Sequence, residues 1–126
     1  MEDLKIGVIG SGGRGSLAIY AHQPGRGSRV VACCDKNPKA FDLNRSWYGN
    51  DIFTTMDYQE LLARDLDAVF VTSPDFLHEE HAVASLSAGK AVYLEKPMAI
   101  TIDGCDRILR TAFAKDVVLY VGHNMR

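Results

Sequence analysis

The sequence predicts an α/β protein built on a doubly wound parallel sheet of six strands, with helices on both faces. Short apolar runs, several of them rich in valine or isoleucine, alternate with segments of helical spacing along the chain. Parallel neighbours need right-handed crossover connections, so this alternation indicates a parallel sheet. A glycine-rich turn directly after the first apolar run is typical of such sheets with the strand order 3-2-1-4-5-6, which is the order that we expect.

Each apolar run is assigned to a strand and each segment between two runs to a helix. The expected strands are Lys5–Ile9, Arg29–Cys34, Ile52–Thr54, Ala68–Thr72, Ala91–Leu94 and Val117–Val121. The expected helices are Ser16–His22, Lys39–Trp47, Tyr58–Ala63, Leu77–Ala88 and Ile102–Ala114. Gly89 has the position of a residue that ends the fourth helix before the next strand begins.

The last helical segment has the clearest amphipathic pattern. One stripe holds the residues expected to pack inward, namely Ile102, Cys105, Ile108, Leu109, Ala112 and Phe113. Two i, i+4 ion pairs are expected on its solvent side, Asp103 with Arg107 and Asp106 with Arg110. Thr101 is expected to cap its first turn.

Length, composition and charge restrict the classes of function. A chain of 126 residues, 47% hydrophobic and 24% charged, has the size and composition of one globular domain spanning residues 1–126. A net charge of −2 gives no basic field for nucleic acid. No apolar run has membrane-spanning length and the start is acidic, so we expect a cytoplasmic protein. Cys33, Cys34 and Cys105 fit no metal spacing and are expected to be reduced, mostly buried thiols.

The glycine turn carries the first functional signal. Gly10, Gly12 and Gly15 form a G-x-G-x-x-G pattern between a strand and a helix, and Asp35 ends the next strand about twenty residues later. The first glycine permits a sharp turn, the second leaves room for a pyrophosphate and the third permits close packing of the helix on the strand. The helix N-terminus attracts phosphate, and Asp35 can accept hydrogen bonds from an adenosine ribose. The pattern therefore predicts a dinucleotide site.

Polar residues follow five of the expected strands at their carboxyl ends, where ligands bind in open α/β sheets. They are the glycine turn, Asp35-Lys36, Thr72-Ser73-Pro74-Asp75, Glu95-Lys96-Pro97 and His123-Asn124. His78 and His81 share a helical face, but no third metal ligand is evident, so we predict no metal site and expect both histidines on the helix surface. His78, in the first turn, could still approach a cofactor.

Asp35 favours NAD over NADP, because a carboxylate binds a free 2′-hydroxyl and repels a 2′-phosphate. Lys36 and Arg14 keep NADP possible, since either cation could compensate a phosphate. Lys96 is expected near the nicotinamide, where an ammonium group can polarise a substrate oxygen or exchange a proton during hydride transfer. Glu95 could hold the nicotinamide ribose or orient Lys96.

These motifs together resemble the N-terminal Rossmann domain of the Gfo/Idh/MocA oxidoreductases, and the similarity spans the whole chain. The resemblance implies NAD(P)-dependent oxidation or reduction of a hydroxyl or carbonyl group, often on a sugar, inositol or related polyol. It also implies that Lys96 is catalytic, that Glu95 contacts the cofactor and that Asn124 lies by the site. The candidate cofactor-binding residues are Gly10, Ser11, Gly12, Gly13, Arg14, Gly15, Asp35, Lys36, Thr72, Ser73, Pro74, His78, Glu95, Lys96 and Asn124.

Members of that family continue into a C-terminal domain that binds substrate and mediates oligomers, and this chain ends where that domain would begin. The chain alone is therefore expected to bind cofactor with little or no turnover, and to form homo-oligomers through the absent domain. Two alternatives remain open: a non-catalytic nucleotide or sugar sensor of the same fold, and an NAD-dependent glycosidase.

Overall fold

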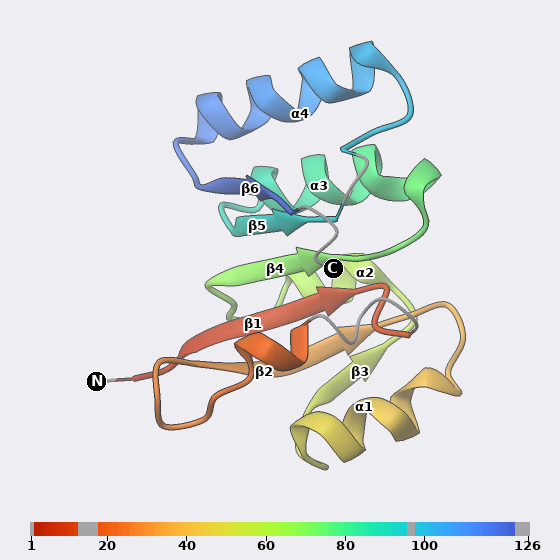
Figure 1. Ribbon diagram of the computed structural model, residues 1–126, viewed down its shortest axis with the longest axis vertical. Helices are drawn as coiled ribbons and strands as arrows, with labels where there is room; N and C mark the ends of the chain where they lie inside the picture. The colour runs from red at the N-terminus through yellow and green to blue at the C-terminus, as the bar shows by residue number, and fades with distance from the viewer. Residues whose placement is uncertain (1, 13–17, 96–97, 123–126) are drawn as a thin grey trace.

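The computed structural model describes residues 2–12, 18–95 and 98–122 of the chain. Six parallel strands form one sheet in the order β3-β2-β1-β4-β5-β6 (Figure 1), which confirms the predicted topology. The strands are β1 (Leu4–Ile9), β2 (Ser28–Cys34), β3 (Phe53–Thr55), β4 (Ala68–Val71), β5 (Ala91–Leu94) and β6 (Leu119–Val121). The order reverses between β1 and β4, so the carboxyl ends of these two strands form the topological switch point of the sheet.

The connections are helical, as predicted, with shifts of a few residues at their ends. They contain α1 (Ala40–Tyr48), α2 (Tyr58–Leu62), the 3-10 helix η2 (Asp75–Leu77), α3 (His78–Ser87) and α4 (Ile102–Lys115). The described part of the segment between β1 and β2 contains a 3-10 turn at residues 18–21. Gly89 follows α3 with φ +81°, which confirms its predicted role in ending that helix.

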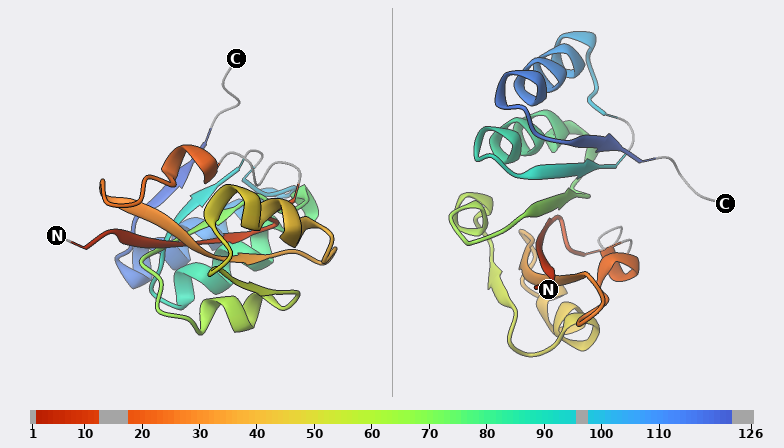
Figure 2. Two further views of the ribbon diagram at one scale, coloured as in Figure 1. Left: turned by 90° about the horizontal axis from the view of Figure 1, so that it is seen from below. Right: turned by 90° about the vertical axis from the view of Figure 1, so that its left-hand side faces the viewer.

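Helices cover both faces of the sheet, and each face has its own core. One core contains Ile9, Cys34 and Val71 with residues of α2, α3 and α4, whereas the other contains Val8 and Cys33 with residues of α1. The edge-on view in Figure 2 shows α3 and α4 on one side of the sheet. Neighbouring residues of a strand point to opposite faces, so Cys33 and Cys34 fall in different cores. Burial raises the pKa of both thiols to about 12, which keeps them protonated at neutral pH.

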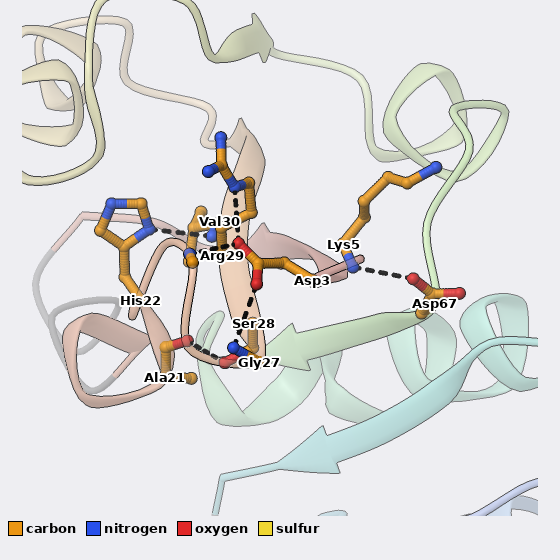
Figure 3. Close-up of polar contacts among 10 residues, drawn as sticks. Asp3, Lys5, Ala21, His22, Gly27, Ser28, Arg29, Val30 and Asp67 are labelled. Atoms are coloured by element: carbon orange, nitrogen blue, oxygen red, sulfur yellow. Dashed lines mark hydrogen bonds and ion pairs between the residues drawn. The ribbon is translucent and has the colours of Figure 1, made fainter. Parts of the chain in front are cut away.

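Polar contacts close the edge of the sheet where the strands begin (Figure 3). The Asp3 carboxylate accepts hydrogen bonds from the backbone N–H groups of Gly25 and Gly27, at 2.7 and 3.0 Å. It also pairs with Nε of Arg29 at 3.1 Å. The backbone donors, followed by Arg29, lower the pKa of Asp3. The turn before β2 is thereby tied to the start of β1, at the end of the sheet opposite the switch point.

The last strand, β6, begins at Leu119 and not at the predicted residue 117, because the motif that ends α4 includes residue 117. Asp116 adopts the left-handed conformation at φ 54°, and its N–H donates to the carbonyl of Phe113. The N–H of Val117 still reaches back to the carbonyl of Ala112 at 3.3 Å. These two bonds form a Schellman motif, so residue 117 belongs to the helix end rather than to the sheet.

The predicted inward stripe of α4 is wrong in part. Ile108 is buried, but Ile102, Leu109 and Phe113 are 87%, 53% and 90% exposed. The helix lies over the edge of the sheet at β5 and β6 and beside α3, so these neighbours cover only one side of it (Figure 1). Thr101 caps the helix as predicted, because its Oγ1 accepts a hydrogen bond from the N–H of Gly104 at 2.9 Å.

Of the two predicted ion pairs on α4, one forms as expected. Nη2 of Arg110 lies 2.9 Å from Oδ2 of Asp106. Arg107 instead reaches Glu79 on α3, with Nη1 3.2 Å from Oε2. The second pair thus links two neighbouring helices, which the spacing within one helix could not predict.

Candidate functional site

The turn after β1 is held between the ends of β2 and β4. The carbonyl of Cys34 accepts hydrogen bonds from the N–H groups of Gly10 at 2.8 Å and Ser11 at 3.0 Å. The Thr72 N–H donates to the carbonyl of Ile9 at 2.9 Å, and its Oγ1 donates to the carbonyl of Gly10 at 2.8 Å. Both neighbouring strands therefore fix the start of the turn at the switch point.

Gly10 is required by both conformation and space. Its φ is +83°, a value that side-chain-bearing residues rarely adopt. A Cβ added there would lie 2.4 Å from the backbone nitrogen of Ser73 and 2.5 Å from its Cα. The end of β4 thus passes against the turn at a distance that only glycine permits.

Asp35 lies beside the second glycine of the motif. Its Oδ2 accepts a hydrogen bond from the N–H of Gly12 at 2.8 Å, and its Oδ1 accepts one from the N–H of Asn37 at 2.8 Å. A Cβ on Gly12 would lie 3.1 Å from Oδ2, so glycine leaves the room that the carboxylate occupies. Each carboxylate oxygen has a further lone pair, so Asp35 can accept additional hydrogen bonds from hydroxyl groups of a ligand.

Ser11 is buried behind the turn rather than in the pocket described below, and its partner is Asn44 on α1. Oγ of Ser11 donates to Oδ1 of Asn44 at 2.7 Å, and Nδ2 of Asn44 donates to the carbonyl of Ser11 at 3.0 Å. Both side chains are buried, with exposed fractions of 1% and 0%. This reciprocal pair ties the turn to α1 and shields its backbone from water.

Asn44→Ala is expected to lower the free energy of unfolding by about 2–4 kcal/mol. The substitution removes two buried hydrogen bonds and leaves the Ser11 hydroxyl without its acceptor. Urea denaturation measures the loss, with Asn50→Ala, at an exposed position just after α1, as the matched control. A loss in Asn44→Ala no larger than that in the control would show that the pair does not hold the turn.

A pocket of about 700 Å³ opens at the carboxyl edge of the sheet. Seven of the predicted cofactor residues line it, namely Gly10, Gly12, Asp35, Lys36, Thr72, Ser73 and Pro74. Asp75, which was expected at the same edge of the sheet, also lines it. Sequence reasoning missed a second group from the end of β3, from η2 and from α3, which comprises Met56, Asp57, Tyr58, Phe76, Leu77, Glu80 and His81. The rule that ligands bind beyond the carboxyl ends of strands could have found Met56 to Tyr58, because these residues directly follow the third strand.

His78 and His81 are buried, so the prediction that they lie on the helix surface is wrong. Their exposed fractions are 0% and 7%. Nε2 of His78 lies 2.8 Å from the carbonyl of Ser73 and must donate to it, whereas Nδ1 of His81 lies 2.7 Å from Oγ of Ser73. Their shared helical face turns toward the end of β4, so the two rings hold the backbone and the side chain of Ser73. His78 acts behind the pocket, and His81 forms part of its wall.

The pKa of His81 is lowered, mainly because burial disfavours the charged ring. Burial also lowers the pKa of His22, whose Nδ1 accepts a hydrogen bond from the N–H of Val30 (Figure 3). Below pH 6.5 the unfolded chain binds protons that the folded chain does not, so acid destabilises the fold. We expect the free energy of unfolding to fall from pH 7 to pH 5, roughly the range of histidine titration.

Urea denaturation across that range tests this pH dependence. His81→Gln is expected to flatten the decrease, and His22→Gln to flatten it by a separate amount. If both variants kept the full pH dependence of the unmodified chain, the assignment to these two histidines would be contradicted.

Glu95 lies at the end of β5 and is 2% exposed. Its backbone N–H donates to the carbonyl of Val71 at 3.0 Å, which joins the ends of β4 and β5. It does not line the pocket, whose lining residues come from the ends of β1, β2, β3 and β4 and from the segments that follow them. The remaining predicted site residues, Gly13, Arg14, Gly15, Lys96 and Asn124, lie outside the described residues.

Residues 2–12, 18–95 and 98–122 contain no group of three or more histidine, cysteine, aspartate or glutamate side chains arranged to hold a metal ion. No helix within the same ranges has the length and apolar character needed to cross a membrane.

Comparison with known proteins relates this geometry to an enzyme family. The inositol 2-dehydrogenase of Klebsiella pneumoniae subsp. pneumoniae is 40% identical over 108 residues, a match that covers 84% of this chain and 32% of that protein. The chain spans about a third of the length of the curated relatives that it matches.

Solved structures match nearly the whole chain. The WlbA dehydrogenase of Bordetella pertussis, crystallised with NADH and UDP-GlcNAcA, superposes with a TM-score of 0.86 at 28% identity, covering 96% of this chain and 36% of that one. The scyllo-inositol dehydrogenase of Lactobacillus casei superposes with a TM-score of 0.85 at 23% identity, with the same two coverages, and shares the fold.

The family model described as an oxidoreductase family with an NAD-binding Rossmann fold matches residues 4–123. That match includes every described element, from β1 to β6, and both the glycine turn and Asp35. The chain therefore belongs to the Gfo/Idh/MocA oxidoreductase family and forms its NAD-binding Rossmann domain.

Proposed function

We propose that this chain is the cofactor-binding part of an enzyme that transfers hydride between a nicotinamide and a hydroxyl or carbonyl group of an inositol, sugar or related polyol. One observation carries the proposal. The glycine turn is held by hydrogen bonds at the switch point, and the N–H of Gly12 in this turn donates to the Asp35 carboxylate. Relatives named as inositol 2-dehydrogenases support the substrate class. NAD supplies the hydride acceptor, and the residues of this chain bind and orient it.

The described residues fit a dinucleotide. Gly10 and Gly12 both line the pocket, and without side chains they let a pyrophosphate approach the backbone of the turn. We assign the adenosine ribose to Asp35, whose oxygens retain free lone pairs, and the adenine to the pocket wall formed by Met56, Phe76 and Leu77. The remaining cofactor contacts that we propose come from Gly13, Arg14, Gly15, Lys36, Thr72, Ser73, Pro74, Glu95, Lys96 and Asn124. Ser11 and His78 are buried behind these contacts, and we propose that they position the turn and the end of β4 for the cofactor.

We propose Lys96 as the catalytic residue and Glu95 as a cofactor contact. Glu95 directly follows β5, the strand next to β4, and Lys96 is the next residue in the sequence. A lysine at this edge can polarise the substrate oxygen and exchange its proton while hydride moves to the nicotinamide.

In this proposal the substrate binds to a second domain that is joined to this chain. Relatives are about three times as long as this chain. We propose that residues 1–126 form the cofactor domain, and that a second domain binds substrate and mediates homo-oligomers. A cytoplasmic enzyme with a small-molecule substrate is consistent with the net charge of −2, which provides no basic surface for nucleic acid.

Calorimetric titration with NADH and NADPH tests the cofactor assignment on the chain itself. Binding of neither nucleotide would overturn it. Turnover is then measured as NADH formation from NAD and a panel of inositols and sugars, using a protein that joins this chain to its substrate domain. Tight NADH binding without turnover of any polyol would favour a sensor over a dehydrogenase.

Asp35→Asn tests the preference for NAD. The substitution keeps an oxygen acceptor but removes the charge, so NADH should bind roughly tenfold more weakly as charge-assisted hydrogen bonds are lost. NADPH should bind more tightly, because the repulsion of its 2′-phosphate is removed. Asp42→Asn removes the same charge from an exposed position on α1 and should change neither affinity. Tighter binding of NADPH than NADH by the unmodified chain would contradict the preference.

A further inference from the structure

The outer side of α4 carries an apolar surface that no part of the described chain covers. We call Ile102, Leu109 and Phe113 the outer stripe of α4; their exposed fractions are 87%, 53% and 90%. At 3.6 residues per turn these three side chains fall within about 40° of one another around the helix axis. An exposed apolar stripe of this kind is typical of a protein–protein contact.

The contacts of α4 within the domain lie on its other sides. Arg107 pairs with Glu79 of α3, and a Cβ on Gly104 would lie 2.7 Å from Oε1 of the same glutamate. Ile108 is fully buried against the core. The outer stripe therefore faces away from α3, and Figure 1 shows α4 as the outermost element at the β6 end of the sheet.

The spacing along this side matches the seam of paired helices. Ile102, Asp106, Leu109 and Phe113 follow one another at intervals of four, three and four residues, as a and d positions do in a coiled coil. Asp106 is the one polar member of the seam, and it pairs with Arg110 at 2.9 Å. A single polar seam position of this kind selects the register and orientation of a partner helix.

We propose that the outer stripe binds the outer stripe of a second copy of this chain, with the two α4 helices antiparallel about a twofold axis between residues 107 and 108. This axis places Ile102 against Phe113 of the second copy, and Leu109 against Asp106 of the second copy. Arg110 of each copy then lies beside Asp106 of the other. Ile102 and Phe113 supply the apolar contacts and the Asp106–Arg110 pairs of the two copies supply the charge contacts, so the same surface serves both copies, as an isologous dimer requires.

Charge also decides the direction of the partner helix. A parallel pair in the same register would place the two Asp106 carboxylates against each other, which is unfavourable. One 14-residue helix from each copy provides a small contact, so the dimer should be weak and depend on concentration. The lining of the cofactor pocket includes no residue of α4, so dimerisation leaves the pocket accessible and the proposal stands apart from the proposed function.

Cysteine crosslinking tests the geometry. In a Cys105→Ala background, a mixture of Ile102→Cys and Phe113→Cys chains should form a disulfide-linked dimer under mild oxidation. Either variant alone should not, because two copies of residue 102 would lie about 16 Å apart along the antiparallel helices, beyond the reach of a disulfide. The native Cys33 and Cys34 thiols are buried and should not interfere. Equal crosslinking of Ile102→Cys alone would overturn the antiparallel arrangement.

Sedimentation velocity over a concentration series tests the surface itself. The unmodified chain should shift toward a dimer as its concentration rises, and Phe113→Glu should weaken the dimer by about tenfold or more. Leu43→Glu introduces the same charge at an exposed leucine of α1 and should leave the dimer unchanged. Circular dichroism shows whether each variant is folded.

A monomer at every concentration would overturn the proposal and leave the stripe to a different polypeptide. Equal weakening of the dimer by Leu43→Glu and Phe113→Glu would also overturn it, because the contact would not then be specific to α4.

Discussion

Gly10→Ala is expected to lower the free energy of unfolding by about 3–5 kcal/mol and to abolish NADH binding. The left-handed backbone at φ +83° accounts for about 1–2 kcal/mol of this loss. The larger part comes from the collision of the new Cβ with the backbone of Ser73, at 2.4 Å from its nitrogen. A side-chain rotation cannot relieve this contact, so the turn must separate from the end of β4.

Gly25→Ala is the matched control for this prediction. Gly25 has nearly the same φ, +80°, but nothing lies within 4 Å of an added Cβ. It should therefore show the conformational strain without the collision, and it should bind NADH normally. Urea denaturation of both variants gives the difference. Equal losses of stability in the two variants would show that the approach of β4 to the turn is not what requires glycine at position 10.

Lys96→Ala is expected to reduce turnover by about 10²- to 10⁴-fold while leaving NADH affinity little changed. The reason is that a proton donor or acceptor at the substrate oxygen contributes mainly to the chemical step. Lys96→Arg separates two roles of the side chain, because arginine keeps the positive charge but does not release a proton at accessible pH. Recovery of turnover in the arginine variant would indicate that charge alone is needed.

Lys90→Ala is the control for Lys96, since Lys90 precedes β5 at the opposite end of the same strand. Its substitution should affect neither turnover nor NADH affinity. Kinetics are measured in a protein that joins this chain to the proposed substrate domain, and affinity by calorimetry. Full turnover in Lys96→Ala would exclude it as the acid or base.

The sequence predicted the strand order and the meeting of the glycine turn and Asp35 at one edge of the sheet, because both depend on local patterns. Apolar runs such as Ala91–Leu94 coincide with the observed strands, and crossover handedness restricts their order. The turn at Gly10 and the carboxylate at Asp35 also meet as predicted. The wall formed by Met56 and Tyr58 was missed, although it follows a predicted strand end as the other site residues do.

The errors concern which face of a helix is covered by other elements of the fold. His81 is a polar residue that the sequence pattern assigns to the helix surface. It is nevertheless buried, because Ser73 at the end of β4 forms a hydrogen bond with its ring. Phe113 belongs to an apolar stripe, yet it is exposed because α4 lies at the edge of the sheet. Periodicity identifies a helical face but not which element, if any, covers it.

The sequence by itself determined the parallel α/β architecture, the glycine turn at the switch point and the acid beside it, since these follow from residue type and spacing along the chain. Only the tertiary structure decided that Asn44 holds the turn, that His78 and His81 support the end of β4, and that no described part of the chain covers one side of α4. These features depend on distances between segments far apart in sequence. Such distances are set by packing of the whole domain, which no local pattern encodes.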